Sequence, residues 1–199
     1  VFAVLEFNRE LPQHVINRPD SAITIDGRLD EPAWQNATTF GAFAFPWWTS
    51  GKQEQTVARM LWDDEFLYVA YECDDAHVSA EQTERDSRVY LDDCVELFTA
   101  PNLDRPQDYF NIEMNVNGAI LDRHHPHGPG EPEIPGWNAR GVKIATAVDG
   151  TLNDDSDTDR GWILEVAIPF ANFADVTGRA FPQDGDVWHL NLNRLGGRT

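Results

Sequence analysis

The 199 residues carry a formal net charge of -19, with a sequence pI near 4.4, and 41% of them are hydrophobic. Such a charge repels phosphate backbones and anionic lipid surfaces, so nucleic acid is not an expected partner. Seven Trp and eleven Phe exclude a disordered chain, and no apolar run approaches the roughly 20 residues that cross a bilayer. We therefore expect one globular domain without membrane insertion.

The first half of the chain predicts short strands separated by turns. Residues 1–22 contain Pro12 and Pro19 and are expected to be an irregular segment packed on a domain formed by residues 23–199. The turn pair Asp26-Gly27 follows a short strand, and Pro32 lies in the first turn of a short helix. The predicted elements are strands at 23–25, 40–45, 56–62 and 66–73, with helical turns at 30–37.

Two alternating strands at 94–98 and 109–117 form the centre of the predicted sheet. Val95 and Leu97 point to one face while Glu96 points to the other. In the second strand, Glu113 and Asn115 are on the face opposite the apolar residues. This polar row fits either a solvated face or the floor of a ligand groove. Later elements are a loop from 123 to 137, strands at 141–148, 162–168 and 187–195, and a helical turn at 170–174.

Several residue types suggest functional sites and also have simpler explanations. Asp155, Asp157 and Asp159 have the alternate spacing of a calcium loop, but the segment lacks the glutamate of an EF-hand and equally suits an acidic hairpin tip. Three His at 124, 125 and 127 lie among Pro and Gly, which favours a loop over a transition-metal site. Cys73 and Cys94 fit two buried thiols or one disulfide.

Aromatic and charged residues supply further candidates for a ligand site. Trp47 and Trp48 are adjacent in a loop and either cover a sheet edge or form an aromatic platform. Arg59, inside a predicted strand, must be paired or face water, and it is expected on the polar face of Glu96 and Glu113. In the last strand, Asn191 points away from the apolar side.

Four segments together resemble family 9 carbohydrate-binding modules and the wider DOMON-like superfamily. They are Ile-Asp-Gly-Arg-Leu-Asp-Glu-Pro-Ala-Trp at 25–34, Leu-Trp-Asp-Asp-Glu-Phe-Leu-Tyr-Val-Ala at 61–70, Asp-Asp-Cys-Val-Glu-Leu-Phe at 92–98 and Arg-Gly-Trp-Ile-Leu-Glu-Val-Ala-Ile-Pro at 160–169. The resemblance covers most of residues 23–195. It implies an all-β fold, an antiparallel β-sandwich of the immunoglobulin-like or jelly-roll kind with short helical turns.

The resemblance also implies a function and a set of site residues. Sugar-binding members hold a terminal sugar between two aromatic rings, use polar side chains of the sheet for its hydroxyls, and bind structural calcium. By position, Tyr90 corresponds to one of the two aromatic residues that hold the sugar, where the known binders have Trp. Glu96 corresponds to the glutamate of the family's motif at 92–98. Glu113 stands where those binders have arginine, and Trp47, Trp48 or Trp137 are the candidates for the second ring.

The expected function is therefore a non-catalytic carbohydrate-binding module for neutral sugar or polysaccharide. It would be an accessory of a secreted, periplasmic or cell-surface polysaccharide-degrading protein with further domains, and no organic cofactor is expected. The carbohydrate ligands would be Tyr90, Glu96, Glu113, Asn115, Arg59, Trp47, Trp48, Trp137 and Asn191.

Three alternatives remain at this point. A haem-binding electron-transfer domain would use Met60 or Met114, although both alternate into the apolar face. A glycoside hydrolase would use Glu96 and Glu113 as paired acids. A structural or protein-interaction sandwich would use neither.

Overall fold

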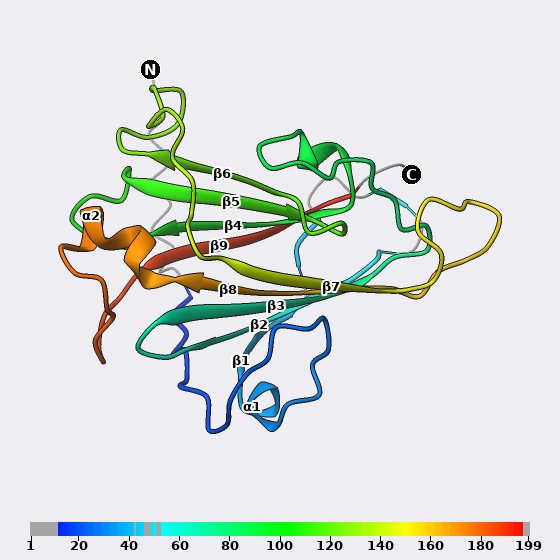
Figure 1. Ribbon diagram of the computed structural model, residues 1–199, viewed down its shortest axis with the longest axis horizontal. Helices are drawn as coiled ribbons and strands as arrows, with labels where there is room; N and C mark the ends of the chain where they lie inside the picture. Colours follow the sequence, from blue (N-terminus) through cyan, green and yellow to red (C-terminus); the bar gives the residue numbers. More distant parts are fainter. Residues whose placement is uncertain (1–11, 42, 46–48, 51–52, 197–199) are drawn as a thin grey trace, which may run out of the picture.

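In the part of the chain that the structure describes, nine strands form two antiparallel sheets, which pack face to face in a sandwich (Figure 1). The computed structural model describes residues 12–41, 43–45, 49–50 and 53–196. Sheet A has the order β1-β2-β3-β8-β7, and sheet B has the order β6-β5-β4-β9. The strands are β1 (Thr38–Phe40), β2 (Thr56–Trp62), β3 (Phe66–Asp74), β4 (Cys94–Ala100), β5 (Tyr109–Asn115), β6 (Ile120–His125), β7 (Lys143–Asp149), β8 (Gly161–Pro169) and β9 (His189–Leu195).

The helical segments are short. They are α1 (Pro32–Gln35), the 3-10 turns η1 (Val89–Leu91) and η2 (Phe170–Phe173), and α2 (Ala174–Thr177). None of the helices in the described part of the chain has the length and apolar character needed to span a membrane. The predicted all-β sandwich with short helical turns is confirmed.

The core between the sheets is built from the alternate residues that point inward on each strand. Met60 and Met114 are both buried in this cluster, which agrees with core filling and leaves no reason to assign them to haem. Cys73 and Cys94 are both buried free thiols, so the disulfide alternative is wrong. Burial raises the pKa of the Cys73 thiol to about 12 and also raises that of Cys94, which keeps both unreactive.

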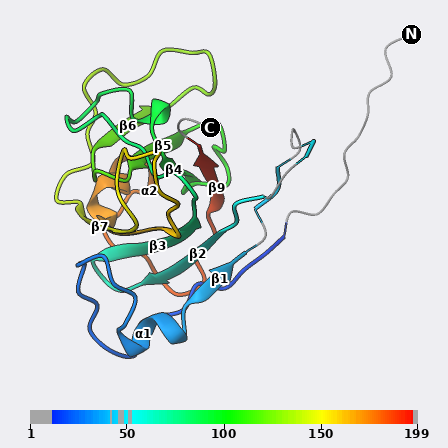
Figure 2. The same ribbon diagram turned by 90° about the vertical axis from the view of Figure 1, so that its right-hand side faces the viewer.

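The outer face of sheet A is covered by the segment that contains α1 (Figures 1 and 2). Glu165 of β8 is fully buried there. Its carboxylate accepts hydrogen bonds from the backbone N–H groups of Asp26, Gly27 and Arg28 at 2.7 to 3.2 Å, and from Trp34 Nε1 at 2.9 Å. The first and last of the four segments that resemble the family therefore meet in a structural contact.

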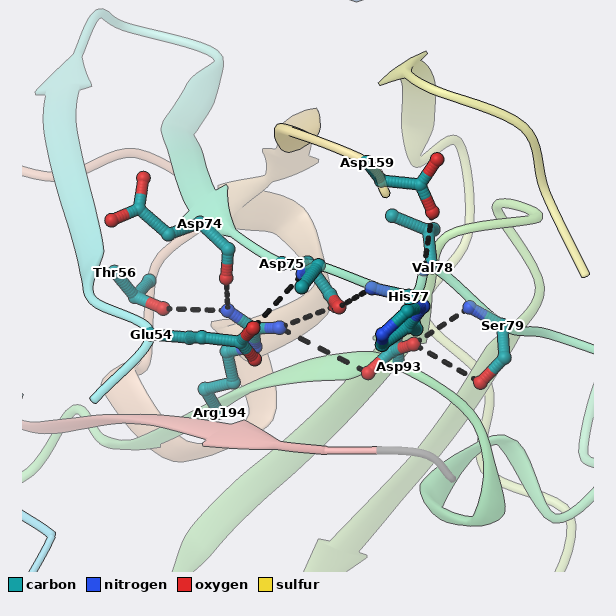
Figure 3. A network of polar contacts seen from close by, with 11 residues as sticks. Glu54, Thr56, Asp74, Asp75, His77, Val78, Ser79, Asp93, Asp159 and Arg194 are labelled. Atoms are coloured by element: carbon teal, nitrogen blue, oxygen red, sulfur yellow. Dashed lines mark hydrogen bonds and ion pairs between the residues drawn. The ribbon is translucent and has the colours of Figure 1, made fainter. Parts of the chain in front are cut away.

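A polar network at one end of the sandwich joins the two sheets (Figure 3). Arg194 of β9 points inward and its side chain is only 6% exposed. Its guanidinium pairs with Asp75 Oδ2 at 2.6 Å and donates to the carbonyl of Asp74 at 2.6 Å, both just at the end of β3. Asp93 lies 3.9 Å away and also accepts from Ser79 N at 2.7 Å. This network fixes β9 against sheet A.

Some sequence predictions of local structure are wrong. Residues 23–25 form no strand, because the segment bonds to Glu31 and Glu165 and has no neighbouring strand. The strand predicted at 40–45 is replaced by β1, which ends at Phe40. His124 and His125 belong to β6 and not to a loop. By contrast, Gly27 has the predicted positive φ, at 85°, and an added Cβ would lie 2.9 Å from the Thr146 carbonyl oxygen.

Candidate functional site

The outer face of sheet B carries a group of carboxylates, amides and aromatic rings. In an antiparallel sheet, residues that lie directly opposite each other project from the same face. Glu96 of β4 lies opposite Glu113 of β5 on one side and Asn193 of β9 on the other. Two residues further along, a second row crosses the sheet from β9 to β6, in which each residue lies directly opposite the next. It consists of Asn191, Phe98, Asn111 and Arg123.

Glu96 is the centre of this face and is held by two amides. Its side chain is buried, with 8% exposed. Oε1 accepts a hydrogen bond from Asn111 Nδ2 at 2.7 Å, and Oε2 accepts one from Asn193 Nδ2 at 2.8 Å. The two donors come from the strands on either side of β4, so the carboxylate is fixed in position between neutral partners.

Glu113 has a different environment from its neighbour Glu96. It lies between Glu96 and the buried Leu121 of β6, and its Oε2 atom is buried without a hydrogen-bond partner in the part of the chain that the structure describes. Burial and, secondly, the negative charge of Glu96 raise the pKa of Glu113 to about 7, while Arg123 acts in the opposite direction. The Arg123 guanidinium is paired with Glu133. The carboxyl group of Glu113 therefore changes its charge near neutral pH.

Three rings extend this polar group along the same face. The Tyr109 ring stacks on His125 of β6, with centroids 4.7 Å apart and an interplanar angle of 16°. On the β4 side, Phe98 lies 5.9 Å from Tyr109. All three side chains are partly exposed. Flat, half-exposed rings beside fixed polar groups are suited to a ligand with one apolar face and several hydroxyls.

The 3-10 turn η1 covers the other end of the face. Val89 packs with Cys94, Leu121 and Leu195, which are the outward residues at that end of the sheet. Tyr90, in the same turn, is 43% exposed. The face is thus limited by η1 at one end and by the three rings toward the other.

Two of the predicted sugar ligands, Arg59 and Trp137, lie away from this face. Arg59 is on the outer face of sheet A, where it pairs with Glu72, so the expectation that it shares a face with Glu96 is wrong. A strand's alternation predicts whether a residue points in or out but not to which sheet it belongs. Trp137 packs on the inward side of sheet B, against Phe110 and His124. Trp47 and Trp48 lie outside the described residues.

Asn115 is on the correct strand but is used by the fold itself. Its amide donates to the Gln82 carbonyl and to Asp92 Oδ2, both at 2.8 Å, and accepts from Ala119 N at 2.9 Å. Asp92 also accepts from the backbone N–H groups of Glu81 and Gln82. These bonds fix the loop before η1, and the side chain of Asn115 has no exposed surface.

Two of the three predicted calcium ligands, Asp157 and Asp159, accept hydrogen bonds within the fold. Asp159 is buried and accepts hydrogen bonds from Val78 N and Thr151 N, each at 2.7 Å. Asp157 accepts from Thr151 Oγ1, and Asp155 is exposed. Within the described residues, no three His, Cys, Asp or Glu side chains gather where they could hold a metal ion. The acidic hairpin tip is the better description of this loop, and calcium binding remains a prediction.

The histidines likewise have structural partners. His124 is buried, stacks on Phe110 with centroids 4.2 Å apart, and lies 2.6 Å from Asp108 Oδ1. His125 projects to the outer face, and burial lowers its pKa below the usual range.

Six residues of the face were not among the predicted ligands: Phe98, Tyr109, Asn111, Arg123, His125 and Asn193. Alternation along 109–117 already puts Tyr109 and Asn111 on the side of Glu113. His125 required the correct assignment of β6, and Asn193 required the β4–β9 register.

Comparisons with known proteins agree with this fold. The family model described as carbohydrate family 9 binding domain-like matches residues 25–193. Endo-1,4-beta-xylanase A of Thermoanaerobacterium saccharolyticum is 28% identical over 178 residues, which are 88% of this chain and 13% of the xylanase. Exoglucanase XynX of Acetivibrio thermocellus is 26% identical over 155 residues, 77% of this chain and 12% of that protein. The chain thus spans about an eighth of either relative.

Solved structures show the same fold at low identity. A protein from Bacteroides uniformis assigned as carbohydrate-binding has a TM-score of 0.72 at 19% identity, with 91% of this chain and 82% of that chain covered. A family 9 carbohydrate-binding module from Caldicellulosiruptor kristjanssonii in complex with cellotriose has a TM-score of 0.61 at 20% identity, with 92% and 76% covered. The chain belongs to the carbohydrate family 9 binding domain-like family and is a non-catalytic carbohydrate-binding module.

Proposed function

We propose that the outer face of sheet B binds carbohydrate. The observation that supports this most strongly is the row of Phe98, Tyr109 and His125 beside the fixed Glu96 carboxylate on one open sheet face. A pyranose presents C–H groups on one side and hydroxyls around its edge. The rings would stack on the C–H groups, while Glu96, Glu113 and Asn191 would bind the hydroxyls.

The direction of the hydrogen bonds supports this division of roles. Asn191 Nδ2 donates to Asn193 Oδ1 at 3.1 Å and leaves its own carbonyl oxygen for a ligand. Asn191 is exposed, whereas Asn111 and Glu96 beneath it are buried. Exposed amides at the rim and a fixed carboxylate at the floor give a site that is formed before the ligand arrives, which lowers the entropy cost of binding.

We infer further that the domain serves a secreted or cell-surface enzyme that degrades β-1,4-linked polysaccharide. The relatives named xylanase and exoglucanase are about eight times longer than the segment they share with this chain. The structural neighbours hold cellotriose and glucose. A binding module keeps a tethered enzyme near its polymer by raising the effective concentration.

Isothermal titration calorimetry with glucose, cellotriose and xylotriose tests this function. We expect saturable binding of at least one of them, weakened about tenfold by Tyr109→Ala because one stacked ring is lost. Glu96→Gln should weaken it by a similar factor, because a charged acceptor is replaced by a neutral one.

Phe181→Ala is the matched control, since Phe181 is 63% exposed and lies after α2, away from this face. The proposal would be wrong if none of the sugars bound the folded domain, or if Phe181→Ala weakened binding as much as Tyr109→Ala. A loss confined to Tyr90→Ala would move the site to η1.

A further inference from the structure

The outer face of sheet B carries more negative charge than its neighbours compensate. Both oxygens of Glu96 are bonded to the neutral amides of Asn111 and Asn193, which leave its charge in place. Glu113 lies directly opposite. Arg123 is the nearby cation, and its guanidinium is already paired with Glu133. Three carboxyl groups therefore share one guanidinium.

Glu113 in particular lacks a donor. Its Oε2 atom is buried and has no hydrogen-bond partner among the described residues. Leu121 lies opposite Glu113 on one neighbouring strand and Glu96 on the other. A buried acceptor that has lost water without gaining a donor is unfavourable. The rest of the side chain is partly exposed, so a ligand on this face can reach the carboxyl group.

The missing group should be both a hydrogen-bond donor and a cation. A metal ion is a poor match, because it needs several free oxygen ligands and both oxygens of Glu96 are occupied. A free amine would make no use of Phe98, Tyr109 and His125. An amino sugar combines both requirements, since its ring stacks on the aromatic residues while its ammonium approaches Glu113.

We propose that Glu113 makes this face select amino sugars, in which an ammonium group replaces one hydroxyl, over neutral sugars. This inference rests on the proposed function of the same face. The Glu113 carboxylate and the ligand ammonium form a charge-assisted hydrogen bond in a partly buried place, where such bonds are about twice as strong as neutral ones.

The selectivity depends on the charge of Glu113. The charged groups that act on it are Glu96 from β4 and Arg123 from β6, which is paired with Glu133. The turn η1, which packs against β5, contributes the exposed Tyr90. Since the pKa of Glu113 lies at about 7, the preference should be weak at acidic pH, where the group is protonated, and should grow as pH rises to neutrality. If Glu113 contributed only its shape to the site, the preference for amino sugars would not depend on pH in this way.

The test compares D-glucose, N-acetyl-D-glucosamine and D-glucosamine by isothermal titration calorimetry. N-acetylglucosamine has the same hexose ring but carries its nitrogen as an uncharged acetamide. Near pH 7 we expect glucosamine to bind about tenfold more tightly than either neutral sugar. The ratio of affinities should fall to about one in Glu113→Gln, while Glu65→Gln, the same charge change on the exposed β2–β3 hairpin, should leave it unchanged.

Proton release provides a second measurement on the same proteins. The number of protons released on binding is measured by titration in two buffers of different ionisation enthalpy. We expect glucosamine to release about half a proton more from the unaltered chain than from Glu113→Gln. The reason is that half of the Glu113 groups are protonated at a pH equal to their pKa. Equal affinity for all three sugars, or equal proton release by both proteins, would overturn the inference alone. Absence of any sugar binding would overturn it together with the proposed function.

Discussion

The carboxyl group of Glu113 has consequences for stability as well as for binding. Its pKa in the folded chain is about 7, above the ordinary glutamate value of 4.5, so the folded state retains the proton to higher pH than the unfolded state. The contribution of Glu113 to the free energy of unfolding is therefore largest below about pH 4.5 and declines as pH rises through about 7.

Removing this titration should stabilise the domain at higher pH. We expect Glu113→Gln to match the unaltered chain near pH 4.5 and to be more stable by about 1 kcal/mol near pH 8, allowing for the partial exposure of the side chain. Urea unfolding at a series of pH values measures the difference. Glu65→Gln is the control, and parallel pH profiles for Glu113→Gln and the unaltered chain would contradict the prediction.

For single residues, the sequence predicts the direction of a side chain where the alternation of one strand determines it. Alternation from Cys94 to Phe98 correctly puts Glu96 on the face of β4 that Val95 and Leu97 do not share. It does not say that Glu96 would be fixed by two amides while Glu113 would lack a donor. That difference comes from Leu121 and Asn193, which reach these residues only through the pairing of β5 with β6 and β4 with β9.

Among the elements, the segment that covers sheet A depends on a single acceptor. Glu165 binds three consecutive backbone N–H groups and the Trp34 indole. Glu165→Ala would leave these donors unsatisfied in a buried place, and we expect it to lower the free energy of unfolding by about 3 kcal/mol or more. Thermal unfolding measures the loss, and Glu65→Ala, an exposed residue of the β2–β3 hairpin, should change stability by less than about 0.5 kcal/mol.

Hydrogen exchange distinguishes local from global loss in the same variant. If the segment alone detaches, the amides of Asp26, Gly27 and Arg28 should lose protection while those of β3 and β8 keep it. Unchanged exchange at these three amides would show that Glu165 does not hold the segment.

Elements with strong local signals were predicted well, and those that depend on distant partners were not. The β2–β3 hairpin follows from two β-rich runs around an acidic turn, in which Asp63 accepts from the N–H groups of Glu65 and Phe66. Residues 23–25 have the same β-rich composition but no strand to pair with. Pro and Gly after His125 concealed the end of β6, because these residues usually indicate a loop.

In the whole molecule, the two sheets are joined at one end through Arg194. Replacing it by Met would remove the cation that pairs with the buried Asp75, and we expect a loss of about 3 to 5 kcal/mol in the free energy of unfolding. Urea unfolding measures this value. Arg160→Met is the matched control, because Arg160 is 81% exposed where it pairs with Asp149, and exposed pairs contribute at most about 1 kcal/mol.

A second substitution distinguishes the effect of the unpaired Asp75 carboxylate from the effect of the packing lost with the Arg194 side chain. Adding Asp75→Asn to Arg194→Met removes one uncompensated carboxylate, so the double variant should be more stable than Arg194→Met alone. If the double variant were less stable, the network would act through shape and packing and not through its charges.

The pairing of β4 with β9 sets the order in which this domain can mature during synthesis. Cys94 to Ala100 are paired with residues 189–195, so about 90 residues must leave the ribosome before that edge of β4 is closed. Until then, an unpaired edge with apolar Val95 and Leu97 is available to other nascent chains. Asn191 and Asn193 arrive with the same strand, so sugar recognition and protection from misassembly would begin in one step, at the end of translation of the domain.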